Sequence, residues 1–190
     1  MGRKPLEGMR VAALVADGVE QKELTEPKEA LEQAGAKVDL VSPERDHIQG
    51  MHHLKPGDRF TVDVPLDQAR PEDYDALLIP GGAYSPDKLR MDERALDFVA
   101  SMDKAGRPIA AICHGPWVLV SAGLVQDRTL TSYRAMKDDV TNAGGNWVDQ
   151  AVVVDRNWVS SREPRDIPDF VHAVISRCHR YLEESGRMAA

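Results

Sequence analysis

The sequence predicts an α/β fold, with a mostly parallel central sheet and helices on both faces, because two kinds of segment alternate along the chain. Short apolar runs rich in Val, Ile and Ala are typical of strands that are buried on both faces of a parallel sheet. Between them lie longer segments whose apolar residues recur every three or four positions, as in helices with one buried face. Segments that alternate in this way form a three-layer sandwich of helices, sheet and helices.

Length and composition fit one such domain. The chain has 190 residues, and we expect residues 1–190 to form a single domain. The hydrophobic fraction of 42% and charged fraction of 29% exclude a wholly disordered chain. The net charge of −7, without a block of like charge, argues against a basic nucleic-acid surface and a polybasic membrane patch.

The expected location is the cytoplasm. The sequence has no run of 18 apolar residues, so we expect no membrane-spanning helix. Acidic residues interrupt the first 20 positions, where a secretory signal needs an apolar stretch. Two cysteines are too few for a disulfide framework, which fits a compartment where thiols stay reduced.

Each element of the first half follows from its apolar pattern and from the residue that ends it. The first strand stops at Asp17 and Gly18, and Gly35 suits the C-cap of the helix that follows. Predicted in order are a strand at residues 9–16, a helix at 20–35, a strand at 37–42, a small β excursion near 60–64 and a strand at 74–80.

The second half is read in the same way and ends with the clearest element. The last helix carries apolar residues from Ile167 to Leu182 at spacings of three and four, all on one face. Before it we predict a helix at residues 92–105, a strand at 107–112, a helix at 115–123, a strand at 129–132, a helix at 136–143 and a hairpin at 151–160.

Unusual polar and glycine residues stand at the ends of three predicted strands. These ends are Asp17-Gly18-Val19-Glu20, Pro80-Gly81-Gly82 and Cys113-His114-Gly115. In parallel sheets, ligands bind outside the carboxyl ends of the strands. We therefore expect the three segments to meet at one functional crevice.

Cys113 lies between an apolar strand and a helix, where a nucleophile elbow would place a reactive side chain. The start of a helix lowers the pKa of a thiol and can hold an oxyanion. The alternative is a buried cysteine that acts as a small hydrophobic residue. Cys178 belongs to the apolar stripe of the last helix, so we interpret it as a core residue.

The polar neighbours of Cys113 have both functional and ordinary interpretations. His114 would flank the reactive space at a sharp turn, or would be a solvated or capping histidine. Glu20 would bring a carboxyl near the elbow, or would be a first-turn glutamate that the helix dipole favours, an interpretation that fits Glu23 and Glu26 better. No histidine or cysteine has further ligands at suitable spacing, so we predict no metal and no cofactor.

Four collinear segments resemble the PfpI family of intracellular cysteine peptidases and stress proteins. They are ALVADGVEQKELTEPKEALEQAGAKVDLVSP, DALLIPGGAYSPDKLR, RPIAAICHGPWVLVSAGLV and TLTSYRAMKDDVTNAGGNWVD. This resemblance implies the fold of class I glutamine amidotransferases. It also places the chain in the superfamily of the Parkinson-disease protein deglycase.

The resemblance implies a role for each of several residues. Cys113 is similar to the family nucleophile, His114 to the adjacent histidine of a peptidase-type triad, and Glu20 to the glutamate that bonds the thiol and moves protons. We expect that glutamate to stay protonated beside a thiolate, since adjacent negative charges raise one pKa.

Three further positions follow from the same resemblance. Gly82 and His114 would supply the N–H groups of an oxyanion hole, and Tyr133 would line the site. Asp87 stands where relatives have an acidic third triad member that reaches the histidine of a neighbouring subunit. Many relatives have Glu there, which is one methylene longer.

The function implied is that of a stress-response hydrolase or deglycase, acting on glyoxal- or methylglyoxal-type adducts. The substrate would be a small molecule or a protein adduct, with nucleic acid expected only as a damaged substrate. Two alternatives are an intracellular peptidase with a Cys113-His114-Asp87 triad, and a redox-sensing or chaperone protein without turnover. The resemblance also implies a homodimer or a larger homo-oligomer.

Overall fold

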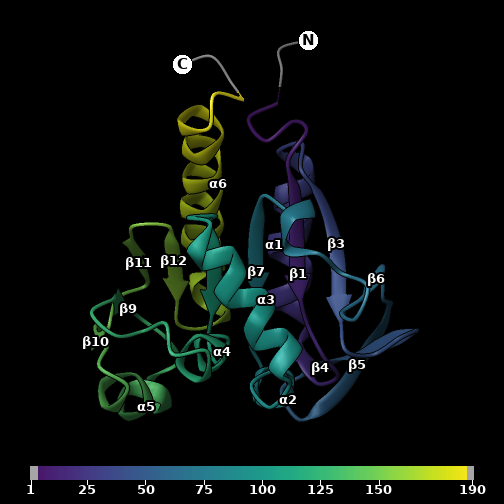
Figure 1. The fold of residues 1–190 in the computed structure, drawn as a ribbon. Helices are drawn as coiled ribbons and strands as arrows, with labels where there is room; N and C mark the ends of the chain where they lie inside the picture. Colours follow the sequence, from purple (N-terminus) through teal and green to yellow (C-terminus); the bar gives the residue numbers. More distant parts are fainter. Residues whose placement is uncertain (1–3, 188–190) are drawn as a thin grey trace.

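The computed structural model describes residues 4–187 and has a seven-stranded central sheet. The strand order is β11-β12-β8-β7-β1-β3-β6, and every neighbouring pair is parallel except β11–β12. The predicted α/β class with a mostly parallel sheet is therefore confirmed (Figure 1). The strands are β1 (Arg10–Leu14), β3 (Lys37–Ser42), β6 (Val64–Pro65), β7 (Ala76–Ile79), β8 (Ile109–Ile112), β11 (Val152–Asp155) and β12 (Trp158–Ser161).

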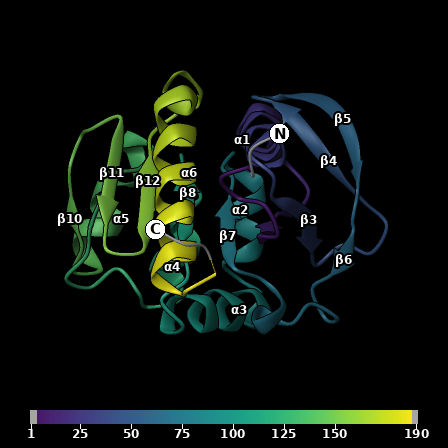
Figure 2. The ribbon, with the colours of Figure 1, turned by 90° about the horizontal axis from the view of Figure 1, so that it is seen from above.

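Helices cover both faces of this sheet, and the alternation of strand residues explains why. Val11 and Ala13 face a core layer formed with α1 and α6, whereas Ala12 and Leu14 face a layer formed with α3, α4 and α5. The two layers lie on opposite sides of the strands in Figures 1 and 2. The helices are α1 (Gln21–Gln33), α2 (Tyr84–Leu89), α3 (Glu93–Lys104), α4 (Pro116–Ser121), α5 (Lys137–Asn142) and α6 (Ile167–Glu184), with short 3-10 turns η1 (Pro71–Asp73), η2 (Arg134–Met136) and η3 (Pro164–Asp166).

The irregular segment after β3 forms more structure than the small β excursion that the sequence predicts. Two antiparallel strands there form a three-stranded sheet with a short strand that lies just before α1. Two other short strands form a parallel pair. Helix α2, which is six residues long and contains Pro86, is not predicted by the apolar pattern. The additional strands are β2 (Val19–Glu20), β4 (His47–His52), β5 (Lys55–Thr61), β9 (Thr129–Leu130) and β10 (Asn146–Trp147).

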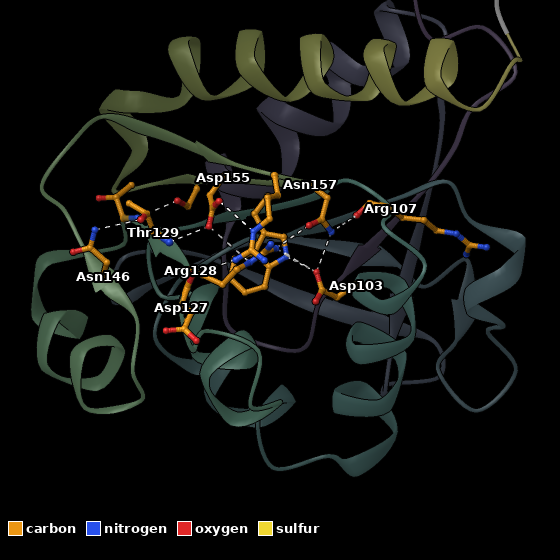
Figure 3. A network of polar contacts seen from close by, with 12 residues as sticks. Asp103, Arg107, Asp127, Arg128, Thr129, Asn146, Asp155 and Asn157 are labelled. Carbon is orange, nitrogen blue, oxygen red and sulfur yellow. Dashed lines mark hydrogen bonds and ion pairs between the residues drawn. The ribbon is translucent and has the colours of Figure 1, made fainter.

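A polar cluster, here called the Arg128 cluster, ties together elements at the amino ends of β8 and β12 (Figure 3). Arg128 is buried and donates to Asn157 Oδ1 at 2.8 Å, and its guanidinium carbon lies 3.8 Å from the ring centroid of Trp158. Asp103 Oδ1 accepts from Asn157 and Trp158 at 2.9 and 2.6 Å. Asp155 Oδ2 accepts from the backbone N–H of Thr129 at 2.9 Å. These bonds connect α3, β9 and the β11–β12 turn.

Within residues 4–187, no helix has the length and apolar character needed to cross a membrane.

Candidate active site

Cys113 sits at a strained turn between β8 and α4. Its φ of 61° lies in the left-handed region, which costs a non-glycine residue on the order of 1–2 kcal/mol. The surroundings hold this conformation, because Cys113 N donates to Ser161 O at 3.1 Å and Cys113 O accepts from Tyr133 N at 2.9 Å. Gly115 lets the turn approach β7 closely, since a Cβ there would lie 2.5 Å from Ile79 O. The predicted elbow is thus present.

The carboxyl beside the thiol belongs to Glu23 rather than Glu20. Glu23 has no exposed surface, and its Oε2 accepts from the backbone N–H of Gly81 at 2.8 Å. A Cβ on Gly81 would lie 2.4 Å from that oxygen and 2.6 Å from Cys113 Cβ, so Gly81 is the spacer that lets the two groups meet. The predicted contact of Glu20 with the thiol is wrong.

Glu20 instead holds the tip of the β4–β5 hairpin. Its Oε2 accepts from the backbone N–H of His53 at 2.9 Å, and His53 has a left-handed φ of 56°. Glu20 and His53 both line the pocket at Cys113, so this bond fixes one wall of the site.

The position of Glu23 on α1 explains why the sequence analysis missed it. Glu23 was interpreted as a first-turn glutamate, but it lies four residues before Pro27 and eight before Leu31, both of which are buried. Residues four apart share a helix face. That spacing was the signal that places Glu23 on the buried side of α1.

Burial sets the proton affinities of this pair. Burial raises the pKa of Glu23 to about 8. The hydrogen bond with the Cys113 thiol opposes this rise, Glu20 adds to it, and the N–H groups of Gly81 and Gly82 also oppose it. Burial and the adjacent Glu23 also raise the pKa of Cys113, although the N–H groups of Gly82 and His114 lower it. At neutral pH both groups therefore tend to keep a proton, and the thiolate that the sequence analysis predicted is not the resting form.

One oxygen of Glu23 stays available for chemistry. Oε1 is buried and has no hydrogen bond of standard geometry to the described residues, whereas Oε2 is held by Gly81. An unsatisfied buried oxygen costs about 1–3 kcal/mol, and such costs collect at functional sites. Glu23 is thus placed to exchange a proton with the thiol or with a bound substrate.

His114 lies against the sulfur on the other side. Its Nδ1 is 3.2 Å from Cys113 Sγ, and its ring stacks on Tyr133 and contacts Trp117 at centroid distances of 4.8 Å. Burial lowers the pKa of His114, so the ring is neutral at physiological pH. Tyr133, which is 40% exposed, lines the pocket beside it, as the sequence analysis expected.

Gly82 has a backbone conformation and close neighbours that a residue with a side chain would not fit. Gly82 has a φ of +84°, and a Cβ there would lie 2.6 Å from Glu20 N and 2.8 Å from Gly18 O. The N–H groups of Gly82 and His114 both interact with the sulfur of Cys113. Two donors that converge in this way can hold an oxyanion formed at the thiol.

Asp87 lies apart from these residues. It is exposed on α2, and no bond or ion pair connects it to His114 within the described part of this chain. The ring neighbours of His114 are Tyr133 and Trp117. A contact between Asp87 and a neighbouring subunit's histidine remains a prediction.

The thiol opens into a pocket of about 410 Å³. The hairpin tip, α2, the elbow and η3 form its walls, and Leu54 and Tyr84 stand exposed at the rim. Cys178, by contrast, is buried in the α6 core, and burial raises its pKa to about 12. Residues 4–187 contain no group of three or more His, Cys, Asp or Glu side chains able to hold a metal.

Comparison with known proteins identifies the family. A model of the DJ-1/PfpI family matches residues 9–177. The chain belongs to the DJ-1/PfpI family. A Pyrococcus horikoshii protein named a deglycase is 45% identical over 159 residues, which are 84% of this chain and 93% of that protein. Deglycase PfpI of Pyrococcus furiosus is 42% identical over the same shares.

The solved structures agree on the fold. DJ-1beta of Drosophila melanogaster superimposes with a TM-score of 0.81 at 25% identity, covering 93% of this chain and 96% of that chain. The resemblance drawn from the sequence is thus confirmed at the level of family and fold.

Proposed function

We propose that this protein is a cysteine-dependent deglycase of the stress response that removes dicarbonyl-derived adducts, of the methylglyoxal type, from thiols and amines. The observation that carries the proposal is the buried Glu23 carboxyl beside a strained, pocket-facing Cys113. The names of the relatives from Pyrococcus support the same reaction class.

The geometry supports a sequence of proton and electron movements. Cys113 Sγ attacks the carbonyl carbon of the adduct and forms a C–S bond, while the π electron pair moves to oxygen. The N–H groups of Gly82 and His114 hold that oxygen. Ionised Glu23 takes the thiol proton as the bond forms, and returns a proton to the departing group. In a hemithioacetal of methylglyoxal the new C–S bond forms at the ketone carbon, and the substrate thiol leaves the neighbouring carbon as its hydroxyl becomes an aldehyde. Water adds to that aldehyde, and hydrogen then moves from the hydrated carbon to the ketone carbon as the Cys113 C–S bond breaks. The products are the free thiol, lactate and the restored Cys113, without net oxidation.

The test measures lactate release from the methylglyoxal hemithioacetal of N-acetylcysteine. We expect Cys113→Ser to reduce the rate at least 100-fold, since serine is a far weaker nucleophile at neutral pH. Cys178→Ala is the matched control, because it removes the other thiol away from the pocket, and it should keep most of the activity of the folded protein. Release by Cys113→Ser at the wild-type rate would refute the proposal.

The same proteins distinguish the two alternatives. Cleavage of unfolded casein that depends on Cys113 and Asp87, without lactate release, would support a peptidase. Client binding that follows oxidation of Cys113, again without turnover, would support a redox-responsive protein.

We further propose a homodimer at least. Leu54 and Tyr84 are exposed at the rim of the pocket, by 85% and 58%, and a second subunit would cover them. Sedimentation that shows an active monomer would exclude a site shared between subunits.

A further inference from the structure

A second cavity of about 640 Å³ adjoins the pocket at Cys113, and the two share Tyr133 and Glu163 in their walls. Four cationic side chains line this second cavity, which we call the arginine groove. They come from η2, the start of α5, the segment after β12 and η3, and they are Arg134, Lys137, Arg162 and Arg165.

Two of these cations are paired with carboxylates. Arg162 Nη1 lies 2.9 Å from Asp149 Oδ1 and its Nε lies 2.8 Å from Asp166 Oδ2. Arg165 Nη2 lies 2.5 Å from Glu163 Oε1, so the charge of Glu163 at the shared wall is balanced.

The other two cations have no such partner. Arg134 and Lys137 are exposed, and the structure shows no ion pair from either side chain to another residue within 4–187. Asp138 is the remaining carboxylate of the lining. The hydrogen bond from Arg162 holds the pKa of Asp149 below its usual range, and the charges of Arg134 and Arg165 add to this effect. The lining thus holds four cations against three carboxylates, and the two cations without an ion pair, Arg134 and Lys137, are the ones free to meet an anion.

We propose that the arginine groove is a subsite for an anionic group, a carboxylate or a phosphate, on the same adduct whose carbonyl carbon reacts at Cys113. The inference rests on the proposed function, because it assigns the substrate class of that site. Tyr133 lines both cavities and stacks on His114, so a substrate lying across Tyr133 would reach the thiol with one end and the groove with the other.

The kinetic test uses two substrates that differ by one charge: the methylglyoxal hemithioacetals of N-acetylcysteine and of N-acetylcysteine amide. At low ionic strength we expect wild type to prefer the carboxylate, through a lower KM, by about fivefold. The double variant Arg134→Gln/Lys137→Gln should lose this preference. Arg180→Gln is the control, because it removes an exposed cation from α6, away from the groove, and it should keep the preference.

A second measurement does not require turnover. N-iodoacetylglycine and its amide alkylate a thiol at the same carbon with loss of iodide, and their rates at Cys113 are compared by mass spectrometry. We expect wild type to favour the anionic reagent, the double variant to lose that bias, and added salt to reduce it.

The outcomes separate the two proposals. Turnover of both hemithioacetals without a charge preference, or with a preference that survives Arg134→Gln/Lys137→Gln, would overturn the proposed anion subsite. It would leave the proposed deglycase activity standing. Absence of turnover, together with a charge bias in alkylation that the double variant removes, would refute the deglycase and support the groove. If Arg180→Gln loses the preference for the anionic compound as fully as the double variant does, the preference reflects overall charge. That result would also overturn the proposed anion subsite.

Discussion

Two buried polar sites lie at opposite ends of the same strands, and they treat charge differently. At the carboxyl ends, the Glu23 carboxyl lies next to the Cys113 thiol, and its Oε1 is buried without a hydrogen bond of standard geometry. At the amino ends, Asp103 accepts bonds from Asn157 and Trp158 and also lies 3.3 Å from Arg128 (Figure 3). The first site leaves a carboxyl oxygen open beside a thiol. The second bonds its carboxylates, Asp103 and Asp155, to donors, although Arg128 Nε itself has no hydrogen bond.

This difference shows what each end contributes. A buried charge with bonded partners stabilises one arrangement of the chain, and removing one partner is costly. A buried carboxyl with an open oxygen costs stability, but it can accept or donate a proton during a reaction. We therefore expect changes at the Glu23 end to alter turnover and changes at the Arg128 cluster to alter the free energy of unfolding.

The largest expected effect is that of Glu23→Gln on turnover. Gln can still bond Gly81 but cannot accept the thiol proton, so lactate release should fall about 100- to 1000-fold, as for the loss of a general base. Glu20→Gln is the matched control on the same helix start. It should lower the rate less than about tenfold, because Glu20 holds the His53 hairpin tip and does not exchange protons with Cys113. Equal losses in the two variants would show that the assignment of Glu23 is wrong.

The next effect is on stability and concerns Arg128. Arg128→Gln leaves Asp103 and Asp155 without their buried cation, and should lower the free energy of unfolding by about 3 kcal/mol. Arg128→Lys keeps the charge but loses the planar contact with Trp158. It should therefore lower the free energy of unfolding, but by less than Arg128→Gln does. Urea denaturation measures both, and a midpoint unchanged from wild type in Arg128→Gln would contradict the role of the cluster.

A third prediction concerns pH. The pKa of Glu23 is about 8 in the folded protein, against an ordinary 4.5, so the folded state keeps a proton that the unfolded state releases. Stability from this group is complete below pH 4.5 and is lost as pH rises to 8. Between pH 5 and 8, the free energy of unfolding of wild type should therefore fall by on the order of 3–4 kcal/mol relative to Glu23→Gln, whose side chain does not titrate.

The activity should change in the opposite direction over the same range. Because ionised Glu23 accepts the thiol proton, kcat/KM should rise with pH toward a plateau above pH 8. Urea titrations and rate profiles on the two proteins provide both curves. A stability difference that is constant from pH 5 to 8 would contradict a raised pKa at Glu23.

The sequence predicted the fold and the elbow because both rest on local patterns. The apolar runs of β1, β7 and β8 and the turn at Cys113 are continuous in the chain, and so is the apolar face of α6. Glu23 was missed because Glu20 also stands at the helix start. The choice between them depends on how α1 packs against Gly81, which is 58 residues away.

The Arg128 cluster and the arginine groove lay beyond local patterns for the same reason. Arg128 meets Asp103 across 25 residues and Trp158 meets Asp103 across 55, so their proximity follows from the strand order. The pKa of Cys113 was misjudged as well, since position before a helix favours a thiolate, but the depth of burial became apparent only from the packed structure.

The smallest expected effect tests whether the two ends are independent. Trp158→Phe keeps a ring beneath Arg128 but removes the N–H group whose hydrogen bond Asp103 accepts at 2.6 Å. Because the acceptor is charged, the free energy of unfolding should fall by about 1–2 kcal/mol. Trp147→Phe is the matched control, since its N–H bonds the neutral hydroxyl of Ser132 at 2.9 Å, and it should cost about 1 kcal/mol or less. Because Trp158 lies at the amino ends of the strands, Trp158→Phe should leave lactate release within twofold of wild type. A larger change in turnover would mean that the cluster also positions Cys113 through β8 or β12, and the division between a stabilising end and a reactive end would then fail.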